Sequence, residues 1–421
     1  NGMLMIENPY NREFADKVCF MDTSVDKRTV TGDRKEFFGS GGMVSPDGLR
    51  NGTLSGTTGA GLDPCGAMQV QVSLGPMETA ELVFVMGLAD SQEEALNLAC
   101  SFKTVDRARD ALTEVEAFWN EKLQVVEVET PDPSMNIMLN GWLQYQVIAC
   151  RMWARSGFYQ AGGAFGFRDQ LQDSLSLAAT WPSLARAQII KHASHQFEEG
   201  DVLHWWHEPT GKGTRTRISD DYLWLPYVTA DYIRISGDMD ILNSKAPYLQ
   251  EKPLKENEED RYCQPLVGLE PHSLYDHCIR AVENALRFGE HGLSLIRGGD
   301  WNDGMNTIGR EGKGESVWLS WFLYATLQKI IPICREMGDG DRADGYALLA
   351  AKVAEAVETH GWDGDWYRRA YFDDGSPLGS AGNSECKIDS LAQTWSAISG
   401  AADSKRAAKA MHALENYLML R

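Results

Sequence analysis

The sequence has no excess of basic residues and no long apolar run. Its 421 residues include 40 Lys and Arg against 60 Asp and Glu, which gives a formal net charge of −20. Because nucleic acids and anionic lipid surfaces are bound by clustered Lys and Arg, this balance argues against both as partners. No apolar stretch approaches the ~18 residues of a membrane-spanning helix. We therefore expect that the chain binds no nucleic acid and crosses no membrane.

The cysteines form no recognisable metal or redox motif. All eight are scattered, without a Cys-x-x-Cys pair and without a histidine at the spacing of a zinc site. Several lie in apolar helical patterns, where cysteine packs as a small hydrophobic side chain. Unpaired cysteines are typical of a reducing compartment. We therefore expect a cytoplasmic location and no metal ion.

The composition is that of a folded protein with large cores. Hydrophobic residues make up 43% of the chain and aromatic residues 10%, including 13 Trp. The length indicates two or three domains. Flat, amphipathic indole rings are also suited to surfaces that bind carbohydrate.

The hydrophobic pattern divides the chain into a β-rich part and a helical part. In 1–104, short stretches separated by glycines suit a β-sandwich. Alternating apolar residues over 68–74, a Gly-Pro turn and a returning stretch over 81–88 predict a hairpin, and the apolar residues of the return predict a buried strand. Helical spacing over 105–133 predicts a helical linker, and 134–421 is predicted to contain only helices and loops.

The helical part predicts an α/α barrel. An apolar stripe from Met135 to Met152 marks its first helix, and the helix around 317–331 is apolar nearly all round, so it should be buried on several sides. Helices nested in two layers favour a barrel over a two-layer bundle. The further predicted helices lie near 169–180, 182–197, 219–236, 273–288, 315–335, 344–360, 389–399 and 403–419.

Long loops rich in Trp, Asp and Gly separate several of these helices. They cover 156–168, 198–218 and 290–314. Alternate loops of a helical barrel lie at the same end of the barrel, so these three loops are expected to converge on a pocket. Long loops without a secondary-structure pattern are uncommon unless they are functional.

The stretch Gly298–Asn306, with the sequence GGDWNDGMN, is the first candidate for a functional loop. An indole can stack on a pyranose ring, Asn and Asp side chains can hydrogen-bond to hydroxyl groups, and a carboxylic acid can protonate a glycosidic oxygen. This mixture indicates sugar chemistry. The alternative is a Gly/Asp/Asn turn that only caps a helix.

A second candidate is the run Arg168 to Asp173, which follows a glycine-rich stretch. Helical spacing places Asp169 and Asp173 on one face, with Arg168 beside them. An Arg and a carboxylate at a helix start can form a fork for sugar hydroxyls. Alternatively, Asp169 only complements the helix dipole.

The third candidate is the His- and Trp-rich stretch around 204–207. His204 and His207 could chelate zinc if the stretch were helical, but no His-Glu-x-x-His frame is present, and Trp205 with Trp206 suits a sugar platform better.

Asp220 and Asp221 follow a Ser and precede an apolar helix. They are first of all N-cap and first-turn acids, which could secondarily present a carboxylate to the pocket. Pro226 predicts a kink in this helix or a later start.

Several long motifs together resemble glycoside hydrolase family 94, the inverting β-glucoside phosphorylases. They are GAFGFRDQLQD at 163–173, EGDVLHWWHEPTGKGTRTRISDDYLWLPY at 199–227 and GGDWNDGMN at 298–306. The stretch HWWHEPTGKGTRTR is similar to the branch that acts on β-1,2-glucans, which includes 1,2-β-oligoglucan phosphorylases and the phosphorylase region of cyclic β-1,2-glucan synthases. VTGDRKEFFGSGG at 30–42 and GSAGNSECKIDSLAQTWSAISG near 379–400 extend the resemblance over nearly the whole chain.

The resemblance implies the C-terminal part of a β-sandwich, a helical linker and an (α/α)6 barrel. It implies reversible phosphorolysis with inversion, in which inorganic phosphate is the co-substrate and no cofactor is needed. Asp303 is the implied general acid, and Trp301 with Arg168 and Asp169 is implied to hold the donor glucose. Phosphate is already an anionic nucleophile, so one acid suffices if burial keeps Asp303 protonated. The other predicted sugar-binding residues are Asp173, Trp205, Trp206, His207, Arg217, Asp220, Asp221, Asp300 and Asn302.

The chain departs from the family in one respect. The family continues with a glycine-rich loop, resembling Glu-Asn-Gly-Gly and then Tyr-Thr-His, that supplies phosphate contacts and an acceptor-side glutamate, and this sequence lacks it. About nine barrel helices are predicted where the fold has about twelve. We expect an incomplete barrel with the phosphate site beyond residue 421. The expected assembly is a homodimer or a larger synthase chain, of which this would be a cytoplasmic region.

Two other functions stay open. An inverting hydrolase of the same barrel type would need a second carboxylate, such as Asp221 or Glu199, across the pocket from Asp303 with room for a water molecule. A non-catalytic glucan-binding region of a synthase would need no acid at all.

Overall fold

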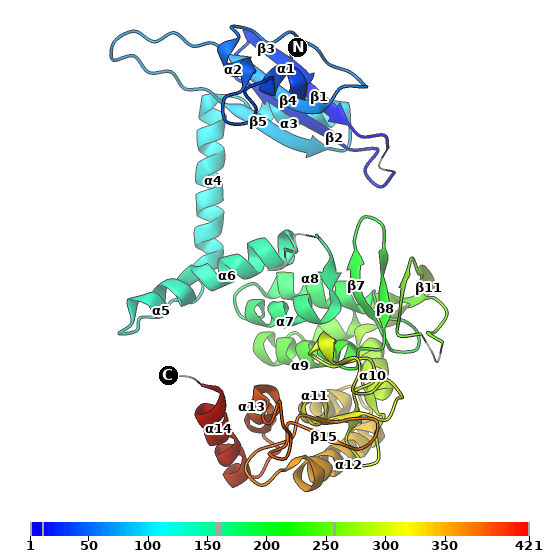
Figure 1. The fold of residues 1–421 in the computed structure, drawn as a ribbon. Helices are drawn as coiled ribbons and strands as arrows, with labels where there is room; N and C mark the ends of the chain where they lie inside the picture. The colour runs from blue at the N-terminus through cyan, green and yellow to red at the C-terminus, as the bar shows by residue number, and fades with distance from the viewer. Residues whose placement is uncertain (1, 11, 157–161, 256–257, 420–421) are drawn as a thin grey trace. The chain divides into compact units, whose positions relative to one another are not determined.

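The computed structural model describes residues 2–10, 12–156, 162–255 and 258–419 (Figure 1). The chain forms two compact units, Asn1–Lys122 and Leu123–Arg421.

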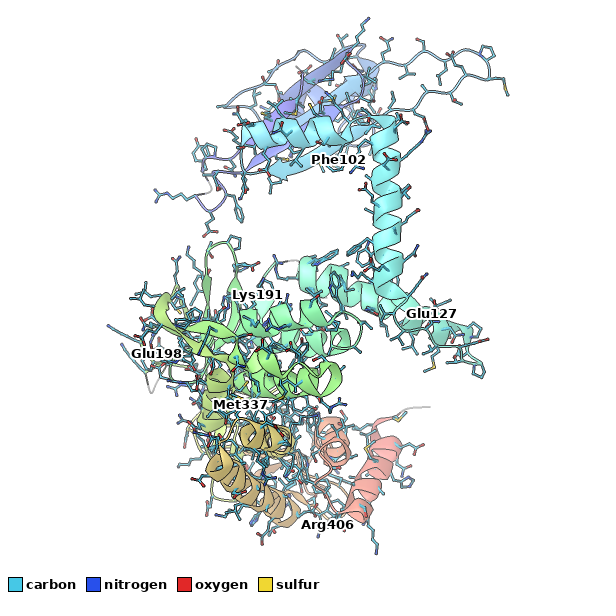
Figure 2. The ribbon with its side chains drawn as sticks, turned by 180° about the vertical axis from the view of Figure 1, so that it is seen from behind. Phe102, Glu127, Lys191, Glu198, Met337 and Arg406 are labelled. Atoms are coloured by element: carbon cyan, nitrogen blue, oxygen red, sulfur yellow. The ribbon has the colours of Figure 1, made fainter. Side chains whose placement is uncertain are left out.

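The first unit packs one helix on a small antiparallel sheet. The sheet has the order β1-β2-β5, and a separate antiparallel pair joins β3 to β4. Buried Val18, Phe20 and Ala89 of the sheet contact Ala95 and Ala99 of α3, whose last residue is Phe102 (Figure 2). The elements are β1 Leu4–Glu7, β2 Val18–Thr23, β3 Arg28–Asp33, α1 Arg34–Phe38, α2 Asp47–Arg50, β4 Pro64–Val70, β5 Phe84–Ala89 and α3 Gln92–Phe102.

The hairpin predicted from 68–74 and 81–88 is wrong. β4 ends at Val70 and pairs with β3, whereas β5 pairs with β2. Gly87 leaves room for the ring of Phe20, because a Cβ at Gly87 would lie 2.5 Å from that ring. The prediction that this strand is buried is also wrong, since Phe84 and Met86 are exposed on its other face.

A long helix, α4 Val105–Leu123, covers the first part of the stretch 105–133 that was predicted as a helical linker, and none of its residues is fully buried. The apolar stripe from Met135 to Met152 does not form one buried helix. Its helix is interrupted at Asn140 and Gly141, where Gly141 has φ 140°, and Met135 and Trp142 are exposed. The segments are α5 Pro133–Ile137, η1 Met138–Trp142, α6 Leu143–Gln146 and η2 Val147–Trp153.

Every helix predicted between 169 and 419 is present. Pro226 lies in the first turn of α9, which begins at Trp224, so the later start is confirmed. Ser273 begins α10 with a capping box, and the Ser316 hydroxyl accepts a hydrogen bond from the Leu319 amide at the start of α11. The helices are α7 Phe167–Leu177, α8 Pro182–Ala193, η3 Asp221–Leu223, α9 Trp224–Ser236, η4 Met239–Asn243, α10 Leu274–Ala285, η5 Asp303–Met305, α11 Val317–Glu336, α12 Gly340–Ala356, η6 Val357–Gly361, α13 Ser390–Ile398 and α14 Ser404–Leu418.

These helices pack in two layers. α7, α9, α11 and α13 contact one another in that order, and α8, α12 and α14 each pack against the helix that precedes them in the chain. Within the first layer, α9 and α11 are buried along most of their length. The helices of the second unit therefore form two packed layers.

Helix α11 is the centre of the second unit. Trp318, Trp321 and Phe322 are completely buried, which confirms a helix enclosed on several sides. Among the described residues, this one helix is long and apolar enough to cross a membrane by length and composition, with a mean hydropathy of 1.3. The prediction that no apolar run reaches that length is thus wrong. However, 78% of that window is buried within the protein, as in an ordinary core helix.

The second unit also contains strands, so the prediction of helix and loop alone from 134 onward is wrong. The predicted loop 198–218 forms the hairpin of β7 and β8, which turns at Gly211 with φ 63°. Short polar strands of this kind carry little hydrophobic periodicity. The sheets are β10-β8-β7-β6, β11-β9 and β12-β13-β14-β15. Their strands are β6 Phe165–Gly166, β7 Leu203–His207, β8 Lys212–Thr216, β9 Lys245–Gln250, β10 Asp260–Cys263, β11 Leu266–Ser273, β12 Ser294–Leu295, β13 Glu315–Ser316, β14 Ala370–Tyr371 and β15 Pro377–Leu378.

Candidate active site

A cavity of about 370 Å³ brings the three candidate motifs together. It is bordered by the first turn of α7 and the residues before it, by strand β7 and by the loop that contains Asp303. Its volume lies within the range of small-molecule sites. The described lining residues are Arg151, Arg155, Gly162, Ala164, Gly166, Arg168, Asp169, Gln170, His204, Trp205, His207 and Asp303.

Asp303 lies at the start of the single turn η5. The Asn302 side chain caps this turn by accepting a hydrogen bond from the Gly304 amide at 3.1 Å. The Asp303 side chain is 50% exposed and flanked by two cations: Arg168 Nη2 lies 3.0 Å from Oδ1, and His204 Nε2 lies 3.5 Å from Oδ2. Asn302 therefore acts on the turn, and Asp303 faces the cavity.

The expectation that burial keeps Asp303 protonated is wrong for this structure. Burial by itself raises the pKa of Asp303, but the hydrogen bond from His204 and the charge of Arg168 outweigh it, and the pKa is lowered from its usual value. The carboxyl group is thus ionised at neutral pH as long as Arg168 and His204 interact with it as they do here.

Arg168 connects the segments that form the cavity. It lies in the first turn of α7, and its buried guanidinium donates to Asp220 Oδ1 at 3.4 Å and to the carbonyl oxygen of Asp300 at 3.3 Å. Since it also pairs with Asp303, one side chain fixes carboxylates from two loops. Burial lowers the pKa of Arg168, but the surrounding aspartates raise it above its ordinary value, so the guanidinium stays charged.

The predicted shared face of Asp169 and Asp173 is confirmed. Both side chains face Arg151, whose Nη2 lies 3.7 Å from Asp169 and whose Nε donates to Asp173 at 2.7 Å. Asp169 is half-exposed and lines the cavity, whereas Asp173 is absent from the described lining. Asp173 therefore acts on Arg151 rather than directly on a ligand.

His204 is a cavity residue that the sequence suggested only as a metal ligand. Leu203 pairs with Arg215 and Trp205 with Thr214, so His204 is the extra residue of a β-bulge. Bulges redirect side chains beside functional sites. Nδ1 of His204 donates to Asp221 Oδ2 at 2.7 Å, and Nε2 faces Asp303.

The charge of His204 is set by its two carboxylates. Burial lowers the pKa of His204, but Asp221 and Asp303 outweigh it and raise the pKa to about 11. His204 is therefore a cation. It lies on a strand, so the helical zinc arrangement with His207 does not form. Among the residues that the structure describes, no group of three His, Cys, Asp or Glu side chains could hold a metal ion.

Asp220 occupies the N-cap position of η3 and Asp221 lies in its first turn, as predicted, but the Asp220 side chain makes no capping hydrogen bond. Instead, its Oδ2 accepts a hydrogen bond from Trp224 Nε1 at 3.0 Å. Both carboxyls are buried behind Arg168 and His204. Burial, only partly offset by Arg168, raises the pKa of Asp220 to about 7. Asp220 and Asp221 therefore hold Arg168 and His204 in place and are not among the described lining residues of the cavity.

Asp300 holds the loop in place and does not face the cavity. Its buried carboxylate accepts hydrogen bonds from Arg369 Nη2 at 2.6 Å and Nη1 at 2.7 Å, and from the Ser316 hydroxyl at 2.7 Å. Neither Arg369 nor Ser316 was predicted. Ser316 belongs to β13 and Arg369 directly precedes β14, 16 and 69 residues after Asp300, so no local pattern indicates them. The prediction that Asp300 contacts the sugar is therefore wrong, because its carboxylate binds Arg369 and Ser316 and holds the loop in place.

Trp301 is 45% exposed, and its Nε1 donates to the Gln172 side chain of α7 at 3.2 Å. It is not among the described lining residues of the cavity. The ring nevertheless remains accessible within the loop that bears Asp303.

Two predicted sugar contacts lie elsewhere. Trp206 is completely buried and stacks on Phe165 and on His195, with ring centroids 5.3 and 3.9 Å apart. Arg217 donates to the carbonyl oxygens of Glu258 at 2.8 Å and Lys255 at 2.5 Å, away from the cavity. Since side chains alternate along a strand, only one of two adjacent tryptophans on β7 can face the cavity, and it is Trp205.

The second carboxylate suggested for a hydrolase is not available at either named position. The His204 ring lies between Asp221 and Asp303, so no water molecule can be held directly between these two carboxyls. Glu199 pairs with Arg215 at 3.0 Å and does not line the cavity. Among the lining residues that the structure describes, Asp169 is the other carboxylate that shares the cavity with Asp303.

Comparison with known proteins agrees with the motifs gathered here. The model for the glycosyl hydrolase 94 superfamily catalytic domain matches residues 118–421, and that for the glycosyl hydrolase 94 supersandwich domain matches residues 1–105. The chain is thus an N-terminal supersandwich region followed by a catalytic domain.

Similar proteins include a synthase and several phosphorylases. Cyclic beta-(1,2)-glucan synthase NdvB of Rhizobium meliloti (strain 1021) is 43% identical over 98% of this chain and 15% of that protein. Solabiose phosphorylase of Paenibacillus borealis is 32% identical over 91% of this chain and 47% of that protein. N,N'-diacetylchitobiose phosphorylase of Vibrio furnissii is 25% identical over 99% of this chain and 53% of that protein. The chain spans about half or less of the length of these relatives.

Three of the family motifs, at 163–173, 199–227 and 298–306, meet at one cavity, and the matches to the two domain models extend over nearly the whole sequence. The chain therefore belongs to glycoside hydrolase family 94.

Proposed function

We propose that the protein containing this chain is an inverting phosphorylase of β-linked gluco-oligosaccharides, with Asp303 as its general acid. The observation that carries the proposal is the position of Asp303 in a cavity that also contains Arg168, Asp169 and Trp205. These side chains supply an acid, a charged fork for hydroxyl groups and an aromatic face, which are the groups that a glycosyl site needs.

The reaction transfers one glycosyl group. Asp303 donates its proton to the glycosidic oxygen while that oxygen leaves the anomeric carbon with the bonding electrons. A phosphate oxygen forms the new bond to this carbon from the opposite face, so a β-linkage gives α-glucose 1-phosphate. Phosphate brings its own negative charge, so no carboxylate base is required. This fits Asp221 and Glu199, neither of which is placed to activate a water molecule.

Substrate binding must return a proton to Asp303 before it can act. In this structure Arg168 and His204 lower its pKa. Sugar hydroxyls that accept hydrogen bonds from Arg168 would compete with Asp303 for this donor, and exclusion of water would favour the neutral carboxyl form. Both changes raise the pKa of Asp303 towards the range in which an acid is effective at neutral pH.

The β-1,2 linkage is proposed from sequence similarity. The cyclic beta-(1,2)-glucan synthase matches at 43% identity, and the solabiose and chitobiose phosphorylases match at 32% and 25%.

For the fold, the two-layer contacts of α7 to α14 support an (α/α)6 barrel. The assembly, as a homodimer or within a larger synthase chain, also remains a proposal.

The test uses the full-length protein. It would be incubated with β-1,2- and β-1,4-linked gluco-oligosaccharides, with and without inorganic phosphate, and glucose 1-phosphate would be assayed. We expect phosphate-dependent cleavage with preference for the β-1,2 series. Equal cleavage without phosphate would instead establish a hydrolase, with Asp169 as the remaining candidate base in the cavity.

A further inference from the structure

A row of residues leads out of the cavity across the sheet β10-β8-β7-β6. Gly166 lies opposite Trp205, Trp205 opposite Thr214, and Thr214 opposite Tyr262. Residues paired across neighbouring strands have side chains on the same face of a sheet. Gly166 and Trp205 line the cavity. The row therefore begins at the cavity and ends at Tyr262 on the edge strand β10.

The opposite face of this sheet is committed to the core. There the next row contains Phe165, Trp206, Gly213 and Cys263. Phe165 and Trp206 are completely buried, and a Cβ at Gly213 would lie 2.8 Å from the Cβ of Trp206. The face with Trp205 and Tyr262 is therefore the one that remains open to a ligand.

The two aromatic rings of the row are neighbours. The ring centroids of Trp205 and Tyr262 are 5.6 Å apart, and the ring planes are inclined by 34°. Tyr262 is 57% exposed, although its strand is paired with β8 along its whole length. His207, which shares this face, meets Trp205 edge to face at 5.5 Å and also lines the cavity. The aromatic surface is continuous from the cavity to Tyr262.

We propose that Trp205 and Tyr262 form an additional sugar subsite, which binds glucose units of an oligosaccharide that extend beyond the cavity. The inference rests on the proposed function, because that function places the reacting end of the oligosaccharide beside Asp303. Two inclined rings offer successive apolar faces to a chain of pyranose rings, whose axial C–H groups stack on aromatic faces. A disaccharide held within the cavity does not reach Tyr262, whereas a longer substrate does.

The experiment measures kcat/KM of the full-length protein for β-1,2-linked gluco-oligosaccharides of increasing length, from the disaccharide upward. In Tyr262→Ala, we expect the value for the disaccharide to stay within about 2-fold and the values for the longer oligosaccharides to fall about 3- to 10-fold. Tyr262→Phe keeps the ring and should match the unchanged protein. Tyr10→Ala removes a tyrosine that is 96% exposed in the first unit and serves as the control.

The disaccharide value reports whether the variant is folded. Equal loss at every length, or no loss with the longest oligosaccharide, would overturn the subsite. Failure of the proposed function has a different signature, which is absence of phosphate-dependent cleavage by the unchanged protein. In that case, calorimetric binding of short and long oligosaccharides to the unchanged protein and to Tyr262→Ala still tests the subsite: a weaker affinity confined to long chains supports it, and equal affinities refute it.

Discussion

At the scale of single residues, the surroundings of Asp303 decide its chemistry. The side chain has the position of an acid in a sugar site, but Arg168 and His204 favour its charged form. His204 is itself kept charged by Asp221, which is buried behind it. The acid strength of Asp303 is therefore controlled by Arg168 and His204, which line the cavity with it, and through His204 by the buried Asp221.

Replacing His204 should change the pH profile in a defined direction. In His204→Gln the carboxyl group of Asp303 loses one adjacent cation, so its pKa rises. The acid form of Asp303 then persists to higher pH, so the basic limb of the plot of kcat/KM against pH should move to higher pH. The profile would be measured on the full-length protein with a disaccharide substrate and phosphate.

The control for this change is His207→Gln. His207 lies in the same cavity, but its Nε2 faces the carbonyl oxygen of Gly162 at 3.2 Å. Its replacement should leave the basic limb in place. A basic limb that stays fixed or moves to lower pH in His204→Gln would show that His204 does not control Asp303.

At the scale of elements, the loop 298–306 is held by hydrogen bonds to residues of other segments. Asp300 is clamped by Arg369 of the residues before β14 and by Ser316 of β13. The Ser219 hydroxyl donates to the carbonyl oxygen of Gly299 at 2.8 Å, which ties the loop to the segment before α9. The loop that carries Asp303 is thus tied to two other segments of the second unit through Asp300 and Gly299.

Breaking this clamp should destabilise the protein strongly. Asp300→Ala leaves the buried guanidinium of Arg369 without its main partner, which costs on the order of 3–5 kcal/mol. The free energy of unfolding would be measured by urea denaturation of the full-length protein. The matched control is Glu259→Ala, which removes an exposed ion pair with Arg310 at 3.2 Å; it should cost less than about 1 kcal/mol. Similar losses in both variants would contradict a buried clamp.

At the scale of the whole molecule, the helices from α7 onward could be predicted from the sequence and strand partners could not. Helical periodicity is local, so α7 to α14 follow the predicted ranges closely. The partner of β5 lies more than sixty residues earlier in the chain, and the short strands β6, β7, β8 and β10 have little periodicity. The predicted hairpin and the loop 198–218 were wrong for these reasons.

The same distinction holds for the site. Motif residues with a local signal, such as Arg168 and Asp169, lie at the cavity. Trp205 and Trp206 lie on opposite faces of one strand, and only Trp205 lines the cavity. Asp300 binds Arg369, whereas Asp303 binds Arg168 at the cavity. Sequence spacing alone cannot separate such pairs. The folded chain separates them into groups that face the cavity and groups that hold it in place.

The central claim is that Asp303 protonates the leaving oxygen, and a leaving group that needs no proton tests it most directly. The full-length Asp303→Asn variant would be assayed with phosphate on a gluco-oligosaccharide and on 2,4-dinitrophenyl β-glucoside, with Asp16→Asn as an exposed control. We predict that kcat/KM for the oligosaccharide falls by about 10²- to 10⁴-fold while that for the aryl glucoside stays within about 10-fold. Equal losses on both substrates, or an unchanged oligosaccharide rate, would contradict the account.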